Sequence, residues 1–516
     1  MILRKVTLFS NDAPIGSTVP RGERKRILVV NAFLDEFQRH SGSHNRVPRA
    51  MGPVYLAGAF ARDLCDVRIF NEQYSGVLHD TRLLGWPDML VLTGVTSSFD
   101  RMLHLTAYAR TLNEKVVVVA GGPAVRALPH HARKFFDYAC LGDIEELQAV
   151  TATVFGPNYA AADMFPRYDL APPSRYLGYA ESSRACNFRC SFCSLTGEKA
   201  RYRTYDLDFV RRQIAAIGRK HIVFIDNNFY GNDRDFFRQK VGLLRDMHRG
   251  DAIKGWSCLV TGDFFARPEN LQLVRDAGCQ FLFSGVESFD ENTLRSYNKR
   301  QNTLVPQVQM IRDCLDAGVF FAYGMMMDPS ARRLADLRAE IEFILGCDEI
   351  PLPAFFTLAI PLLGTPYFRE CLARGLFFPH TRLRNLDGVT LTLRPLDPIP
   401  EVVDFASGLP RLRGYRGRVA AHTARFLRRY RRRLSWLQLC GEVVNAMLVS
   451  MEAFATSPGL PWADRPARTF FGPTEILDSL YTPVIRVPSR YEGHFHATQV
   501  TDEKGALAED LAEDLG

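Results

Sequence analysis

The sequence Cys186-Asn187-Phe188-Arg189-Cys190-Ser191-Phe192-Cys193 decides the architecture of this chain. Its three thiols, spaced Cx3Cx2C, lie close enough along one loop to converge on a single inorganic centre, as they do in iron–sulfur clusters. Three cysteine ligands on a [4Fe–4S] cubane leave one iron without a protein partner, and an open position is typical of a catalytic metal site. The residues just before the motif, 176–181, read as a strand. We therefore expect Cys186, Cys190 and Cys193 in a loop at the carboxyl end of that strand.

A structural zinc site is the alternative interpretation of these cysteines, and it requires a fourth ligand. The nearest histidine after the motif is His221, and the chain offers no partner cysteine pair. Ligand counting therefore favours the cluster. The remaining cysteines are isolated along the 516 residues, which favours buried thiols in a reducing compartment over a disulfide framework.

Downstream of the motif, strands and helices alternate. Strands are expected at 176–181, 222–225, 255–260, 281–286, 320–325 and 354–360. Helices are expected at 208–218, 233–247, 268–277, 306–317 and 334–345. Six such units in order predict a partial (β/α)6 barrel over 175–395, in which function belongs at the carboxyl ends of the strands.

Upstream of the motif, residues 26–150 predict a second α/β domain, a doubly wound parallel sheet with buried strands. The expected strands are 26–30, 67–70, 89–93, 116–120 and 138–141, with helices at 54–64 and 99–112 between them. In such sheets ligands bind beyond the carboxyl ends of the strands. Small and polar residues stand there, namely Thr96, Ser97, Gly121, Gly122 and the pair 142–143.

The remaining segments complete the domain organisation. We expect an N-terminal extension over 1–25, a linker over 151–174 and a largely helical C-terminal region over 396–516, with one long helix at 416–454 and an acidic tail. The composition, 47% hydrophobic and 23% charged, is that of a globular protein. Since no apolar stretch is long enough for a signal peptide or a membrane span, we expect a cytoplasmic protein.

The net charge of +7 is concentrated in one segment, 411–433, which holds ten arginines and no acid. Such a helix can be a solvated face, with its long side chains extended into water. It can also contact an anionic membrane surface through 416–454, or an acidic substrate or partner. Nucleic acid is disfavoured, because the arginines lack the interleaved aromatic residues of a stacking platform.

The cysteine motif, with the aromatic Phe192 before its last cysteine and a strand before its first, resembles that of the radical S-adenosylmethionine (SAM) superfamily. The resemblance implies that the open iron chelates the amino and carboxylate groups of the methionine part of SAM. It also implies that an electron, from a donor such as flavodoxin or ferredoxin, breaks a carbon–sulfur bond and yields a 5′-deoxyadenosyl radical.

Two downstream segments extend this resemblance. The stretch 224–229 is similar to the end of the second barrel strand of the superfamily, where polar groups, here Asp226, Asn227 and Asn228, approach the methionine amine. The stretch 285–288 resembles the end of the fourth strand, with Glu287 as an acceptor for hydroxyl or amine groups of the cofactor and Ser288 beside it. A solvated loop acid is the alternative for Glu287.

The order of the two domains, together with 121–123 and 142–145, resembles the cobalamin-binding subclass of this superfamily, which includes the anaerobic Mg-protoporphyrin monomethyl ester cyclase of chlorophyll synthesis and the hopanoid methylases. The resemblance implies that Gly121 and Gly122 let the backbone approach the corrin while Thr96 and Ser97 supply hydroxyls. No Asp-x-His-x-x-Gly motif occurs, so the lower face of cobalamin is expected to be open or covered by a residue from 42–53. A degenerate sheet retained for structure is the alternative.

These expectations combine into a hypothesis about function. The resemblance implies a cobalamin-dependent radical SAM enzyme, in first place a methyltransferase that acts on an unactivated carbon of a lipid, tetrapyrrole or natural-product intermediate. The substrate is then a small molecule, and nucleic acid is not a partner. One rival is a radical cyclase or oxidoreductase without net methyl transfer. A rival of another class is a noncatalytic, metal-stabilised binding protein.

Overall fold

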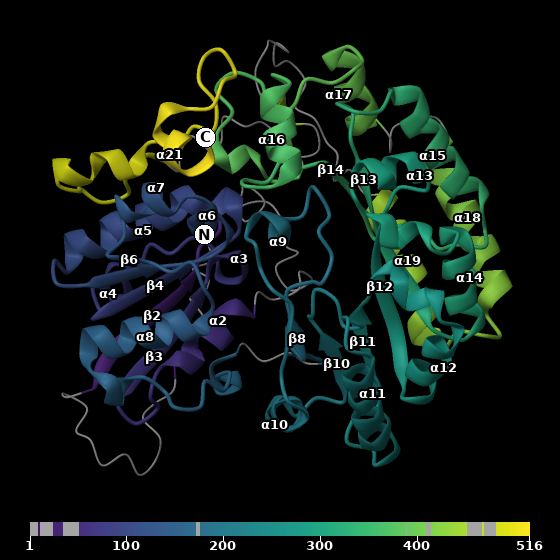
Figure 1. Cartoon of the computed structure of the whole chain (residues 1–516), viewed down its shortest axis with the longest axis horizontal. Helices are drawn as coiled ribbons and strands as arrows, with labels where there is room; N and C mark the ends of the chain where they lie inside the picture. The colour runs from purple at the N-terminus through teal and green to yellow at the C-terminus, as the bar shows by residue number, and fades with distance from the viewer. Residues whose placement is uncertain are drawn as a thin grey trace, which may run out of the picture. The chain divides into compact units, whose positions relative to one another are not determined.

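The computed structural model of the chain describes residues 9–10, 24–34, 51–171, 176–388, 390–408, 414–450, 467–468 and 481–516 (Figure 1). They belong to two compact units, the first of 1–173, 379–387 and 474–516 and the second of 174–378 and 388–473. The chain after 378 is therefore shared between both units, whereas the sequence suggested one separate C-terminal region.

The first unit is built on a sheet of six strands in the order β1-β3-β2-β4-β5-β6. Its parallel strands are β2 (Lys25–Asn31), β3 (Cys65–Asn71), β4 (Met89–Thr93), β5 (Val117–Ala120) and β6 (Tyr138–Ala139), while β1 (Phe9–Ser10) pairs antiparallel with β3. The predicted doubly wound parallel sheet is thus confirmed. Because β2 lies between β3 and β4, the direction of winding reverses there, and this switch point is where such sheets bind ligands.

Helices cover both faces of this sheet, with α5 and α7 on one side and α2 and α8 on the other (Figure 1). Their bounds are α2 (Gly52–Leu56), α3 (Glu72–Ser75), α4 (Thr81–Leu84), α5 (Phe99–Leu112), α6 (Pro123–Ala127), α7 (Pro129–Arg133) and α8 (Ile144–Phe155). The helix expected over 99–112 is confirmed. The helix expected over 54–64 is wrong in extent, because the chain is already extended at Phe60, which forms a β-bridge with Ala160.

The last residues of the chain return to the first unit and pack on α5 and α7. The ring of Phe495, at the end of the 3-10 helix η12 (Ser489–Phe495), stacks on His104 at 4.9 Å. The backbone N–H of Thr498 donates to Asp100, and the N–H groups of His130 and His131 donate to Asp514. At least one acid of the predicted acidic tail is therefore a hydrogen-bond acceptor for α7.

Acid should loosen this C-terminal segment, because burial lowers the pKa of His494 to about 4 from an ordinary value of 6.5, with Arg110 lowering it further. The released segment binds a proton below pH 6.5 and the packed segment only below about 4, so packing weakens as the pH falls through this window. In pulse proteolysis, we expect cleavage within 481–516 to begin at a lower urea concentration at about pH 5 than at pH 7. His494→Phe keeps the ring contact with Phe135 and should reduce this difference; an equal pH response in the variant would contradict the assignment.

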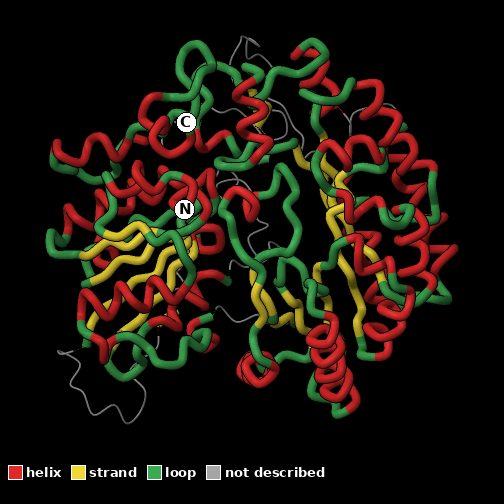
Figure 2. Tube along the Cα trace, in the orientation of Figure 1, coloured by secondary structure: helices red, strands yellow, loops and turns green. Residues whose placement is uncertain are grey.

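The second unit is built on six parallel strands in the order β14-β13-β12-β11-β10-β7, so that β7 and β14 are edge strands that do not pair with each other. The strands form a curved sheet (Figure 2). The strands are β7 (Leu177–Ala180), β10 (His221–Phe224), β11 (Gly255–Leu259), β12 (Cys279–Glu287), β13 (Phe320–Met327) and β14 (Phe355–Leu358). Each predicted strand matches one of these, so the partial (β/α)6 barrel is confirmed.

Two of the helices between these strands begin at a capping aspartate. Asp206 and Asp233 accept hydrogen bonds from the first turns of α10 and α11, and α10 ends at Gly218 with φ +60°. The helices are α10 (Leu207–Ile217), α11 (Arg234–Arg249), α12 (Pro268–Asp276), α13 (Glu291–Ser296), α14 (Gln307–Asp316), α15 (Leu334–Gly346), α16 (Pro366–Ala373) and α17 (Ile399–Gly408).

The arginine-rich region is two helices, α18 (Tyr415–Tyr430) and α19 (Trp436–Ser450), so the single helix predicted over 416–454 is wrong. Residues 451–454 lie outside the described residues. The break follows from local chemistry, because Arg431, Arg432 and Arg433 place like charges at the end of α18. The Ser435 hydroxyl then accepts from the Gln438 N–H at 3.4 Å, and the Ser435 N–H donates to Gln438 Oε1 at 2.8 Å, so that Ser435 caps α19. Among the described helices, none combines the length and the hydropathy needed to cross a bilayer.

Candidate functional site

The Cx3Cx2C loop follows β7 and the short strand β8 (Ser183–Arg184), and its last cysteine precedes α9 (Ser194–Gly197). It therefore lies beyond the carboxyl end of the first barrel strand, as predicted. Cys190 is buried, and Cys186 and Cys193 are half-buried. Backbone contacts hold the loop in place, because Ser191 N–H donates to the Tyr297 carbonyl at 2.9 Å and Tyr367 N–H donates to the Ser191 carbonyl at 3.0 Å.

The three thiols affect one another electrostatically. Burial raises the pKa of the Cys186 thiol to about 11, and the neighbouring Cys190 and Cys193 add to the increase. Burial also raises the pKa of Cys193, against which the positive charge of Lys299 acts. Within the described ranges, no three His, Cys, Asp or Glu side chains are close enough to hold a single metal ion. The donor set fits a cluster, because iron stabilises thiolates that burial alone disfavours.

Two residues that the sequence analysis missed surround this loop. Lys299 Nζ lies 2.5 Å from Glu287 Oε1 and 5.6 Å from the centre of the Phe192 ring. Burial lowers the pKa of Lys299, but the charge of Glu287, with those of Cys190 and Cys193, raises it above its ordinary value. Gln301 Nε2 donates to Cys190 Sγ at 3.3 Å. The stretch 298–302 reads as a polar surface loop, so only the folded chain brings these side chains to the cysteines.

Gln301 should tune the electronic state of a bound cluster. A hydrogen bond to a cysteine sulfur stabilises the reduced, more negative cluster, and such bonds are among the factors that set reduction potentials. We expect Gln301→Leu to make the potential of the reconstituted cluster more negative in an EPR-monitored redox titration. Gln272→Leu, which removes an exposed glutamine on α12, is the matched control and should leave the potential unchanged. Equal potentials in all three proteins would contradict this role.

Glu287 lies at the end of β12 in a strained backbone conformation. Its φ is +62°, and the pairing of β12 with β13 shifts between Gly285 and Glu287. A non-glycine residue in the left-handed region costs free energy, and a bulge of this kind redirects a side chain. The Glu287 carboxylate forms an ion pair with Lys299, whose pKa is also raised by Cys190 and Cys193. The structure therefore places Glu287 beside the cluster loop.

Ser288, the next predicted residue, turns away from Glu287. Its hydroxyl donates to Glu340 Oε1 at 2.7 Å and accepts from Arg332 Nη1 at 3.2 Å. The ion pair of Arg332 with Glu340, at 2.6 Å, fixes this arrangement. A contact of Ser288 with a cofactor stays a prediction.

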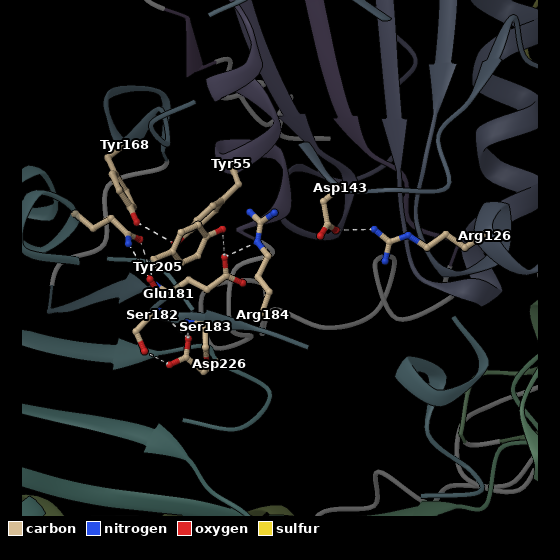
Figure 3. A network of polar contacts seen from close by, with 11 residues as sticks. Tyr55, Arg126, Asp143, Tyr168, Glu181, Ser182, Ser183, Arg184, Tyr205 and Asp226 are labelled. Atoms are coloured by element: carbon tan, nitrogen blue, oxygen red, sulfur yellow. Dashed lines mark hydrogen bonds and ion pairs between the residues drawn. The ribbon is translucent and has the colours of Figure 1, made fainter. Parts of the chain in front are cut away.

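At the end of β10, Asp226 is fully buried and engaged with the residues that precede the cluster loop (Figure 3). It accepts from the backbone N–H groups of Ser182 at 2.6 Å and Ser183 at 2.7 Å, and from the Ser182 hydroxyl. The buried ammonium of Lys240, on α11, donates to the same hydroxyl at 2.9 Å and to the Phe229 carbonyl at 2.7 Å. Asp226 thus supports the start of the loop, and its predicted contact with a cofactor is untested.

Asn228 connects the same strand end to the cysteine motif. Its Nδ2 donates to Asn187 Oδ1 at 2.7 Å, and Asn187 directly follows Cys186. Its Oδ1 is buried without a hydrogen-bond partner among the described residues. An acceptor is therefore left beside the loop, as a site for an amine would require. The neighbouring Asn227 is exposed.

In the first unit, the predicted ligand-binding residues lie at adjacent strand ends. Thr96 and Ser97 form part of the 3-10 helix η3 (Thr96–Ser98) after β4, at the switch point of the sheet. Gly121 and Gly122 follow β5, and Gly122 has φ +113°. A Cβ at Gly122 would lie 2.9 Å from the Gly94 carbonyl oxygen, so only glycine permits this approach of the two loops.

The loop after β6 is also fixed by polar contacts. Arg126 Nη2 donates to the Gly142 carbonyl at 2.7 Å and to Asp143 Oδ1 at 2.8 Å (Figure 3). Of the segment 42–53 that was expected to cover the cobalamin face, 42–50 lies outside the described residues. The first unit thus brings hydroxyls and glycines together at one edge of the sheet. The assignment of corrin contacts stays a prediction.

The second unit contains a cavity of about 900 Å³ beyond the ends of β12 and β13, between α13, α15 and α16. Asp328, in its wall, accepts from the Tyr297 hydroxyl at 2.5 Å and the Tyr367 hydroxyl at 2.7 Å. The ring of Tyr297 lies 5.4 Å from that of Phe192 and its carbonyl accepts from the loop. Tyr297 therefore connects the wall of this cavity to the cluster loop.

Comparison with known proteins gives the same picture. Residues 181–331 match the radical SAM superfamily. Hopanoid C-2 methylase of Rhodopseudomonas palustris (strain TIE-1) is 26% identical over 331 residues, which are 59% of this chain and 62% of that protein. Bacteriochlorophyllide d C-8(2)-methyltransferase of Chlorobaculum tepidum is 24% identical over 322 residues, which cover 56% of this chain and 69% of the other. The chain thus spans less than two thirds of the hopanoid methylase.

The fold has a counterpart among solved structures. The cobalamin-dependent S-adenosylmethionine radical enzyme OxsB, with aqua-cobalamin and S-adenosylmethionine bound, superimposes with a TM-score of 0.56 at 15% sequence identity, over 83% of this chain and 72% of that one. This similarity extends the agreement from the motif to the architecture. The motif, the barrel strands and the matched region coincide, so residues 181–331 are identified as a radical SAM domain.

Proposed function

We propose that this chain is a cobalamin-dependent radical SAM methyltransferase that acts on an unactivated carbon of a small molecule. The observation that carries the proposal is the Cx3Cx2C loop at the carboxyl end of the first strand of an open parallel barrel, in a chain that also contains a doubly wound sheet. Two relatives with known names are methylases, and the solved structure with the same fold binds both cobalamin and SAM.

The residues of the second unit have distinct proposed tasks. Cys186, Cys190 and Cys193 hold the [4Fe–4S] cluster, which supplies an electron for cleavage of SAM to the 5′-deoxyadenosyl radical. Asn228 offers its unpartnered oxygen to an amine of SAM. Glu287, charge-balanced by Lys299, offers a carboxylate to its hydroxyl or amine groups. A radical reacts with water, so the proposed chemistry requires that the loaded site be closed to solvent.

In the first unit, the strand ends at Thr96, Ser97, Gly121 and Gly122 are the proposed cobalamin site. Glycines at the ends of β4 and β5 let the two loops pack closely at this edge of the sheet. The hydroxyls of Thr96 and Ser97 can hydrogen-bond the side chains of the corrin. The electron donor is proposed to be a small reductant such as flavodoxin or ferredoxin. Lipids, tetrapyrroles and natural-product intermediates are the proposed substrate classes.

Anaerobic purification and product analysis test this function. We expect a brown protein with about four irons per chain. With reductant, SAM and added cobalamin, it should release 5′-deoxyadenosine and also S-adenosylhomocysteine, the product of methyl donation. Formation of 5′-deoxyadenosine without cobalamin-dependent S-adenosylhomocysteine would favour the radical cyclase or oxidoreductase. A colourless protein that contains zinc and forms neither product would refute the proposal in favour of a noncatalytic binding protein.

A further inference from the structure

Helix α19 has its polarity reversed relative to an ordinary helix on a protein surface. The residues of its buried face are mostly polar, namely Gln438, Glu442, Asn445 and Val449. Its exposed residues are large and apolar, namely Trp436 (79% exposed), Leu437 (49%), Val443 (41%), Val444 (50%), Met447 (52%) and Leu448 (45%). These six residues recur at helical spacing along one side, here called the apolar face of α19. A contiguous exposed patch of this kind indicates an interaction site.

The polar residues of α19 fix this orientation. Gln438 Nε2 donates to the carbonyls of Gln280 and Gly318, both at 2.8 Å, next to the amino ends of β12 and β13. Glu442 accepts from Leu352 N–H at 2.9 Å, and Asn445 donates to the Leu352 carbonyl at 2.8 Å. Rotation of the helix would break all four bonds and leave buried backbone groups unpaired. The apolar face is therefore held outward by the fold.

Unpaired positive charge borders the apolar face. α18 and α19 pack against each other (Figure 1). Several arginines of this region form ion pairs with acids of the barrel, namely Arg418 with Glu342 and Arg429 with Glu349 on α18, and Arg433 with Asp316 just beyond the end of α18. The exposed Arg428, Arg431 and Arg432 have no ion pair among the described residues.

Two of these arginines meet the apolar face directly. Arg428 and Arg431 line a groove of about 340 Å³ together with Trp436 and Val443. The single acid between 411 and 450 is Glu442, which is fully buried. The surface thus combines an apolar strip, an interfacial tryptophan and cations, with no acid of its own segment exposed.

We propose that the apolar face of α19, with Arg428, Arg431 and Arg432, docks this protein onto the surface of an anionic lipid bilayer. A helix that lies in the membrane interface has these features: apolar residues that enter the acyl boundary, and basic residues that meet lipid phosphates. Tryptophan favours the same depth, because its ring is apolar and its N–H is polar.

Charge argues against a second copy of the chain as the occupant. A two-fold interface places the same patch on both subunits, so it would bring six unpaired arginines together without a compensating acid. Lipid phosphates neutralise these charges instead. The proposal is independent of the radical chemistry, because α19 contacts the amino ends of the barrel strands and the cysteines lie at the carboxyl end.

Vesicle binding by the full-length protein tests the proposal. We expect co-sedimentation with phosphatidylcholine vesicles that contain phosphatidylglycerol, weak binding to phosphatidylcholine alone, and weaker binding in high salt. The triple variant R428Q/R431Q/R432Q should lose roughly 10²-fold in apparent affinity, since each basic residue near an anionic surface contributes about a five-fold factor. The control R418Q/R429Q/R433Q removes the same net charge from arginines that are paired with acids, so its loss should be much smaller.

The apolar contribution has its own variant, L437Q/V444Q/M447Q, which should also weaken binding at least tenfold while it keeps iron content and 5′-deoxyadenosine formation. Quenching of Trp436 by brominated lipid, absent in Trp436→Phe, would locate the helix at the interface. If both triple-arginine variants lose the same vesicle affinity, the effect depends on net charge alone and the proposed site is wrong. Vesicle binding that L437Q/V444Q/M447Q leaves unchanged would also overturn the site. A third contrary result would be that the unmodified protein is a dimer that binds no vesicles and that L437Q/V444Q/M447Q converts to a monomer.

Discussion

Serine in place of any one of Cys186, Cys190 and Cys193 will reduce 5′-deoxyadenosine formation to background. Each thiol is one of three protein ligands, and serine is a poor ligand for iron, so the cluster loses its attachment to the loop. Without a cluster no electron reaches SAM, and turnover falls by at least roughly 10³-fold given ordinary enzyme rates. Iron and sulfide analysis after anaerobic reconstitution, together with chromatographic detection of 5′-deoxyadenosine, measures both effects.

The matched control is Cys347→Ser in the same unit. Cys347 is also half-buried, and burial raises the pKa of its thiol, but it follows α15 and lies outside the motif. Its variant should keep the iron content and the activity of the unmodified protein. If serine at Cys190 preserves both iron and 5′-deoxyadenosine formation, the cluster site is wrong.

The strands of both sheets could be predicted because their signal is local. Runs such as Ile27–Val30 and Leu90–Leu92 are apolar at successive positions, which only a strand covered on both faces requires. The cysteine motif was expected beyond the strand 176–181, and β7 (Leu177–Ala180) ends shortly before it. The sequence therefore predicted the two sheets, their order and the place of the cluster loop.

The features that were missed depend on contacts between residues distant in sequence. Lys299 and Gln301 meet the cysteines over a separation of more than a hundred residues, and nothing in their neighbourhood distinguishes them from a surface loop. The return of 481–516 to the first unit depends on contacts such as that of Phe495 with His104. The orientation of α19 is a further feature of this kind, because its polar residues are buried and its large apolar residues are exposed, the reverse of what hydrophobic pattern alone indicates.

Lys240→Met will destabilise the second unit by about 3–5 kcal/mol, since it removes one charge of a buried pair and leaves the other without compensation. Lys240 and Asp226 are both fully buried and share the Ser182 hydroxyl as a hydrogen-bond partner. Burial lowers the pKa of Lys240 to about 8 and raises the pKa of Asp226. The charge of each group opposes the effect of burial on the pKa of the other. Urea unfolding of the anaerobically reconstituted protein measures the loss, and Arg238→Met, an exposed cation on the same helix, should change it little.

The same pair decides between two roles for Asp226. If Asp226 only supports the start of the cluster loop, Asp226→Asn will lower stability, and the double variant with Lys240→Met will recover part of it because no buried charge remains. The affinity for SAM should then be unchanged in the protein that folds. If Asp226 contacts the cofactor, as its position after β10 predicts, SAM affinity will fall in both variants and the double variant will not restore it. Equilibrium binding of SAM to the reconstituted cluster form, measured beside the urea midpoint, separates the two roles because only one of them couples Asp226 to the ligand.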